Sequence, residues 1–123
     1  MIRMIARKLL LPRGDTGNFT IPLLSSHTSE NTVAIFSILN LITNEVIYQD
    51  EAIIEDRTVR VSFTHEKTKN LPLGQYVWDI KVYTNPEYKN NKLINGETVD
   101  SYYAGFSYPV CEITLGRDKR VIE

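Results

Sequence analysis

The stretch that decides the fold is Thr68-Lys69-Asn70-Leu71-Pro72-Leu73-Gly74-Gln75-Tyr76-Val77-Trp78-Asp79-Ile80-Lys81-Val82. Side chains alternate between the two faces of a β-strand. One face of a strand here carries Tyr76, Trp78, Ile80 and Val82, and the other carries Gln75, Val77, Asp79 and Lys81. Val77 is the one apolar exception, so the pattern predicts a strand with its aromatic and aliphatic face toward a core.

The residues in front of this strand predict a tyrosine corner. Leu71, Gly74 and Tyr76 form a Leu-x-x-Gly-x-Tyr turn that leads to Trp78. In such a corner the tyrosine ring enters the core and its hydroxyl bonds to nearby backbone, which fixes a crossover between two sheets. We therefore expect an all-β fold, a single antiparallel Greek-key β-sandwich.

Length and composition place the chain among ordinary single-domain proteins. It has 123 residues, of which 42% are hydrophobic and 24% charged. One core is expected at this length. Fourteen basic and fifteen acidic residues give a formal net charge of −1. This balance predicts neither a nucleic-acid partner nor a membrane partner.

Cys111 is the single cysteine, so it excludes an internal disulfide. The first eleven residues contain no apolar run longer than Leu9–Leu11, which Pro12 ends. A secretory segment needs roughly 7–15 apolar residues and a membrane span ~20. Synthesis and retention in a cytoplasm, or assembly into a particle there, are expected.

Short β-rich runs with turn residues between them predict the remaining strands. The expected strands are residues 3–11 (which would also suit a short amphipathic helix), 19–23, 32–40, 41–48 as a hairpin with its predecessor, 58–64 and 102–115. Residues 65–71 are expected to form one helical turn, and residues 85–100 a long polar, flexible loop. Pro22 and Pro109 would protect edge strands. The domain is predicted to cover residues 1–116, followed by a charged tail at 117–123.

Asp15-Thr16-Gly17 resembles half of a retroviral-type aspartic protease, in which two aspartates share a proton across a dimer axis. Leu115-Gly116-Arg117 echoes the apolar-Gly segment that supports such a site. The flanks differ, because Arg13-Gly14 precede the motif and Asn18 follows it. They favour a glycine-supported turn. Arg13-Gly14-Asp15 is also the tripeptide that integrins read, but no export signal accompanies it.

His27 and His65 stand alone in polar segments, and no second ligand lies at metal spacing. We therefore expect no catalytic, cofactor-binding or metal-binding residues. An aromatic cluster spans residues 102–108, with Tyr103 on the outward face of the expected strand. Together with the 85–100 segment it suggests a contact surface formed by Tyr88, Leu93, Ile94 and Tyr103. The alternative is a sugar-stacking platform to which Tyr83 and Tyr88 would contribute.

The motifs together resemble a known group of proteins. They are Leu11-Pro12-Arg13-Gly14-Asp15-Thr16-Gly17-x-Phe19, Thr68-x-x-Leu71-x-x-Gly74-x-Tyr76-x-Trp78-Asp79-Ile80 and the closing Gly105-Phe106. The group comprises the small immunoglobulin-like β-sandwich proteins of tailed bacteriophages and of prophages. In its pattern Arg13, Gly14 and Asp15 are turn-formers.

The resemblance implies a non-catalytic structural or accessory protein of the tail or baseplate. Its partners would be other virion proteins, with self-association as a further expectation. It would reside in the bacterial host cytoplasm during assembly and then in the virion. The alternatives are a carbohydrate-binding or receptor-contacting module and, more remotely, the aspartic protease.

Overall fold

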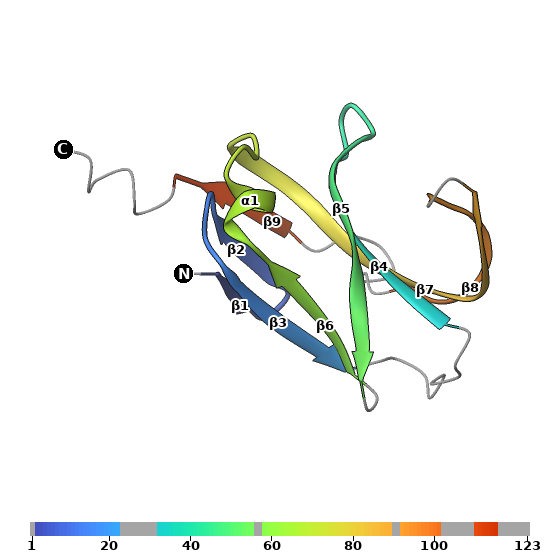
Figure 1. The fold of residues 1–123 in the computed structure, drawn as a ribbon. Coiled ribbons are helices and arrows are strands. Elements are labelled where there is room, and N and C mark those ends of the chain that lie inside the picture. The colour runs from blue at the N-terminus through green and yellow to red at the C-terminus, as the bar shows by residue number, and fades with distance from the viewer. Residues whose placement is uncertain (1, 23–31, 56–57, 90–91, 102–109, 116–123) are drawn as a thin grey trace.

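A computed structural model describes residues 2–22, 32–55, 58–89, 92–101 and 110–115, with residues 84–89 and 92–101 described through their backbone. The strands are β1 (Arg3–Ile5), β2 (Lys8–Pro12), β3 (Gly17–Pro22), β4 (Thr32–Asn40), β5 (Glu45–Glu55), β6 (Thr58–Phe63), β7 (Gly74–Lys89), β8 (Lys92–Ser101) and β9 (Val110–Thr114). One helix, α1 (His65–Thr68), precedes β7. The all-β prediction is confirmed (Figure 1).

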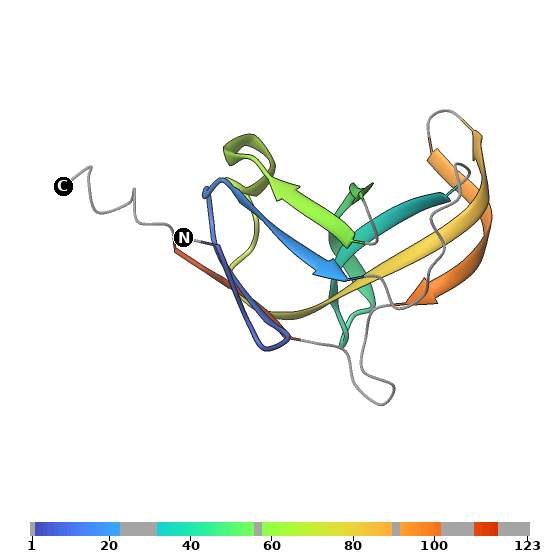
Figure 2. The same cartoon turned by 90° about the horizontal axis from the view of Figure 1, so that it is seen from below.

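The nine strands of the described residues form one nearly closed sheet. Its order is β1-β2-β9-β7-β4-β5-β6-β3, and β8 pairs with β7 beside this path. All strand pairs are antiparallel except β2 with β9, which run parallel. β7 runs the length of the molecule and continues into the ribbon that it forms with β8 (Figure 2).

The sheet folds over because β5 changes partner along its length. Ala52 still pairs with β4, whereas residues from Ile53 onward pair with β6. Aromatic rings meet across the resulting interior. The ring centroids of Phe19 and Trp78 lie 6.0 Å apart, and those of Phe36 and Phe63 lie 5.6 Å apart. β3 and β6 therefore face β7 and β4 around a single core.

The core consists of alternate side chains of the paired strands. Buried members include Leu9, Leu11, Phe19, Ile21, Ala34, Phe36, Ile38, Tyr48, Val59, Val61, Phe63, Leu71, Trp78, Ile80, Val82, Cys111 and Ile113. The predicted inward positions Trp78, Ile80 and Val82 are confirmed, and Tyr76 is half-buried against the same cluster.

The prediction of one strand over residues 3–11 is wrong, because this segment forms the β1–β2 hairpin. Ala6 makes the turn with a φ of 55°. The turn lets β2 lie beside β9, which places Leu9 and Leu11 in the core. A continuous strand would have carried the chain past β9.

The prediction of a flexible loop over residues 85–100 is also wrong. β7 extends to Lys89 and pairs with β8. The two strands are paired through their backbones, and such pairing does not require apolar and polar residues to alternate. The sequence therefore gives no strand pattern here. The register shifts between Thr84 and Glu87, which accommodates Pro86 because proline cannot donate to a ladder.

Several other boundaries agree closely with the sequence, but the strand predicted over 41–48 is wrong: β5 begins after the turn and continues to Glu55, because its end pairs with β6. β4 spans the predicted 32–40, β6 ends one residue early at Phe63, and the helical turn is α1. β3 is the last strand of the sheet order, and Pro22 is exposed on it, as expected at an edge. Of the predicted strand over 102–115, the structure describes β9. Tyr103, Pro109, His27, Leu23 and the tail 117–123 lie outside the described residues.

Candidate functional site

The Arg-Gly-Asp segment forms the turn between β2 and β3. The Asp15 amide donates to the Pro12 carbonyl at 3.1 Å, and Gly14 takes a φ of 89°, which glycine tolerates best. The Arg13 amide donates to the Thr114 carbonyl of β9 at 2.7 Å. The turn is therefore joined to the sheet by its own backbone.

Helix α1 packs on this turn. The Thr68 hydroxyl is buried and donates to the Asp15 carbonyl at 3.0 Å. His65 Nδ1 donates to the Gly14 carbonyl at 2.8 Å, since a carbonyl oxygen can only accept. His65 thus makes a structural contact with this turn, while its side chain remains exposed.

The four corner residues lie close together at the start of β7. Leu71 is buried, and the Tyr76 hydroxyl donates to the Leu73 carbonyl at 3.2 Å. Gly74 has a φ of 139°, and a Cβ built on it would lie at an ordinary contact distance, 3.5 Å, from the Tyr76 hydroxyl. The backbone conformation therefore accounts for glycine here.

Trp78 lies at the centre of the core and is fully buried. Its indole Nε1 donates to the Arg7 carbonyl at 3.0 Å. Cys111, on the neighbouring strand β9, is also fully buried, and burial raises the pKa of its thiol to about 12. A thiol with so little thiolate at neutral pH is a poor nucleophile.

The predicted contact residues are only partly brought together. The backbone register places Tyr88 on β7 opposite Leu93 on β8, and Ile94 follows Leu93 along β8. Tyr103 lies outside the part of the chain that the structure describes.

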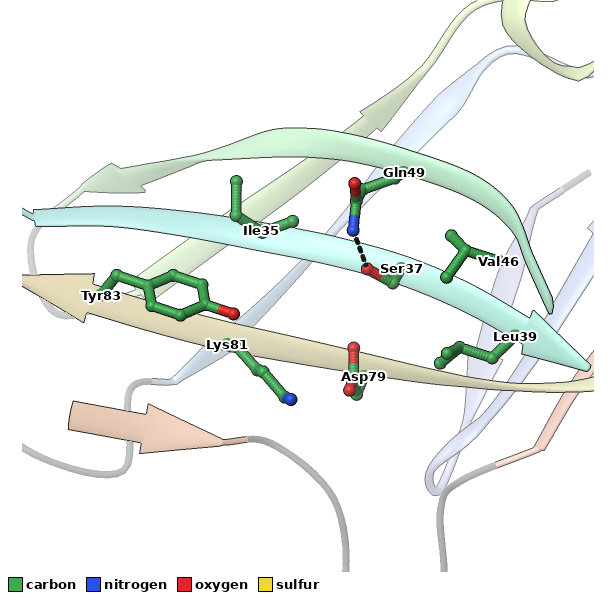
Figure 3. A pocket seen from close by; sticks show the side chains of 8 residues that line it. All are labelled: Ile35, Ser37, Leu39, Val46, Gln49, Asp79, Lys81 and Tyr83. Atoms are coloured by element: carbon green, nitrogen blue, oxygen red, sulfur yellow. Dashed lines mark hydrogen bonds between the residues drawn. The ribbon is translucent and has the colours of Figure 1, made fainter. Parts of the chain in front are cut away.

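A pocket that the sequence did not predict lies on the face of β4, β5 and β7 opposite the core. We call it the outer-face pocket. Its volume is about 170 Å³, and it is lined by Ile35, Ser37, Leu39, Val46, Gln49, Asp79, Lys81 and Tyr83 (Figure 3). Polar groups lie in its middle and apolar groups on either side.

Asp79 is the unusual group of this pocket. It is directly opposite Ser37 in the β4–β7 register and only 5% exposed. Gln49 Nε2 donates to Ser37 Oγ at 3.0 Å, whereas Asp79 has no hydrogen bond or ion pair among the described residues. Burial raises the pKa of Asp79, and the nearby Lys81 lowers it by a smaller amount.

The β4–β5 turn next to the pocket carries exposed apolar side chains. Ile42 is 96% exposed and Leu41 55% exposed. Val46, which follows the turn, is also exposed and lines the pocket. The Asn40 side chain accepts from the Ile42 amide at 3.0 Å, which orders the turn. The turn stands away from the body of the molecule (Figure 1).

Sequence reasoning missed Ser37, Gln49 and Asp79 because three different strands contribute them. One signal for this site was available in the sequence. Asp79 is an acidic residue between the core residues Trp78 and Ile80, so it lies on the opposite face of the strand.

Among the described residues, no group of three or more His, Cys, Asp or Glu side chains could hold a metal ion. None of the described helices is long and apolar enough to cross a membrane. Comparison with protein-family models, with curated proteins and with solved structures found no match.

Proposed function

We propose that this chain is an immunoglobulin-like Greek-key domain that serves as a non-catalytic structural or accessory protein of a phage or prophage particle. It acts through protein–protein contacts in the virion, in the tail or baseplate. The sequence resemblance supplies the virion setting, and the outer face of the sheet supplies the contact surface.

The strand connections support the Greek-key part of this proposal. β4, β5 and β6 follow one another as antiparallel neighbours, and β3 lies beside β6, so the spatial order is β3-β6-β5-β4. Three consecutive strands with the fourth returned to their far side is the Greek-key arrangement. The hydrogen bond from Tyr76 to Leu73 supports a tyrosine corner at the crossover from β6 to β7.

The observation that carries the contact role is the apolar β4–β5 turn, continuous with the outer-face pocket. Ile42 is almost fully exposed on an ordered turn. Exposed apolar side chains that gather beside a pocket are typical of surfaces that bind a partner. Many weak contacts of this kind add up when a protein is present in multiple copies.

The Asp15 backbone, the His65 ring and the Cys111 thiol have structural roles in the fold, which favours a non-catalytic role. The backbone of Asp15 is bound to Thr68, and His65 to Gly14. The Cys111 thiol is buried in the core.

Purified particles test this function. We expect the chain to migrate with particles prepared from its native source by density gradient, detected with an antibody. Ile42→Ser should lower the amount per particle several-fold without changing the melting temperature. The control is Leu73→Ser, which changes an exposed apolar residue near the Tyr76 corner. Absence of the chain from the particle band would contradict the virion role.

A carbohydrate-contacting module is the second candidate. The outer-face pocket combines the Tyr83 ring with the amide of Gln49 and the carboxylate of Asp79. Aromatic rings and polar side chains of these kinds also bind sugars. A glycan array would separate the two candidates.

A further inference from the structure

Resting on the contact role proposed above, we infer that the outer-face pocket binds the guanidinium group of an arginine presented by a partner protein, with the Asp79 carboxylate as its main acceptor.

The floor of the pocket is rich in acceptors. Asp79 offers two carboxylate oxygens without a hydrogen-bond partner in the described structure. Gln49 uses its Nε2 to donate to Ser37 Oγ, so its carbonyl oxygen is left to accept. A guanidinium carries five N–H donors and no acceptor, and its planar shape suits a carboxylate.

A buried carboxylate without partners destabilises a fold, because folding removes water from the charge. Lys81 lies two residues away on the same face of β7, but it makes no ion pair with Asp79 within the described chain. Burial outweighs the effect of Lys81 on the pKa of Asp79. A cation brought by a partner would supply the missing compensation.

The walls of the pocket match the rest of an arginine side chain. Ile35 and Leu39 are apolar and partly buried, and Val46 is apolar and exposed, so the three can cover a methylene stem (Figure 3). The Tyr83 ring lies at the same end of the lining as Ile35, away from Leu39 and Val46, and a guanidinium there can also contact an aromatic face (Figure 3).

The exposed β4–β5 turn extends the same surface. Val46 belongs both to the pocket and to the group of exposed apolar residues that includes Leu41 and Ile42. An arginine anchor flanked by apolar contacts has the composition of an interface hot spot. The partner is therefore expected to present arginine next to aliphatic or aromatic residues.

Titration of the isotope-labelled full chain followed by NMR tests this inference. The probe is Nα-acetyl-arginine amide, and its neutral counterpart is Nα-acetyl-citrulline amide. We expect saturable shifts at the Ser37 and Asp79 amides and the Gln49 side-chain amide, with a Kd on the order of 10 mM. Citrulline amide should shift these signals far less.

Two variants provide the controls. Asp79→Asn should weaken arginine binding at least fivefold, and it should fold because the carboxylate has no partner to lose among the described residues. Glu112→Gln should leave binding unchanged, because Glu112 pairs with Lys8 at 3.7 Å and does not line the pocket. Unchanged binding by Asp79→Asn would overturn the inference.

Three further results would also overturn it: equal shifts with citrulline amide, equal shifts with Nα-acetyl-lysine amide, or stronger shifts of the same signals with methyl glycosides. Failure of the arginine-binding inference can be distinguished from failure of the proposed virion role. A chain that migrates with particles but ignores arginine refutes the pocket assignment alone. A chain that binds arginine but is absent from particles refutes the virion role.

Discussion

The indole of Trp78 and the carbonyl of Arg7 join the centre of the core to the turn of the first hairpin. The Nε1–O distance is 3.0 Å, and the two residues are 71 positions apart in the sequence. Ala6, the neighbour of Arg7, has a φ of 55°. The hydrogen bond therefore fixes a turn that is unfavourable for a residue with a side chain.

Replacing Trp78 by Phe should destabilise the fold by about 2–3 kcal/mol. The variant leaves a cavity beside Phe19 and Phe36 and removes the donor for Arg7. Urea unfolding followed by circular dichroism measures the change. A loss below about 0.5 kcal/mol would show that the indole is not a central packing element.

Two tyrosines should respond oppositely to removal of their hydroxyl. Tyr76→Phe should cost about 0.5–1 kcal/mol, because the hydroxyl is bonded to Leu73 in a half-exposed position. Tyr48→Phe should be neutral or stabilising by up to about 1 kcal/mol, since the Tyr48 hydroxyl is buried without a partner in the described structure.

The two variants serve as controls for each other, because each removes one oxygen atom from a tyrosine. The melting temperature should fall for Tyr76→Phe and should stay the same or rise for Tyr48→Phe. Equal destabilisation by both would contradict the assigned hydrogen bonding.

Gly74→Ala should destabilise by about 1–2 kcal/mol, because a φ of 139° is strained for a residue with a Cβ. Gly17→Ala is the matched control. Gly17 lacks a positive φ, and its Cβ would meet Ile2 at an ordinary 3.5 Å. We expect its effect to stay within about 0.5 kcal/mol, and similar losses at both glycines would refute the backbone explanation.

Asp79→Asn should raise the melting temperature at pH 7, because the ionised carboxylate is buried without a partner among the described residues. The folded pKa is raised above the ordinary 3.8. Stability therefore falls as pH rises through the window between these two values, and the penalty is complete above the folded pKa.

The stability difference between the Asn variant and wild type should thus shrink as pH is lowered from 7 to 4. The charged side chains that share this face with Asp79 include Lys81 and Glu51, which both proteins retain. A difference that is constant over this range would rule out Asp79 as its cause.

Cys111 should be inert in the folded chain. Burial raises its pKa to about 12, so the thiolate that reacts with Ellman's reagent is scarce at pH 8. Full reaction is expected in guanidinium chloride. Rapid labelling of the native chain would contradict the buried placement. We also expect thermal unfolding to be insensitive to EDTA and to reductant.

The sequence by itself determined the strands that bury one face. Trp78, Ile80 and Val82 alternate with polar neighbours, and β4 has its predicted bounds, because a period of two is visible locally whenever one face meets a core. Gly14 and Gly74 also indicated where the chain turns. Both have positive φ angles, which glycine adopts without strain.

Only the tertiary structure decided the features that depend on pairing between residues far apart in the sequence. Residues 85–100 look like a loop, but backbone pairing makes them part of the β7–β8 ribbon, and backbone hydrogen bonds leave no pattern in side chains. Residues 3–11 look like one strand, but β9 and the Trp78 indole turn them into a hairpin. The outer-face pocket arises because the strand register sets Asp79 opposite Ser37 and Ser37 opposite Gln49, and no local stretch of sequence contains that register.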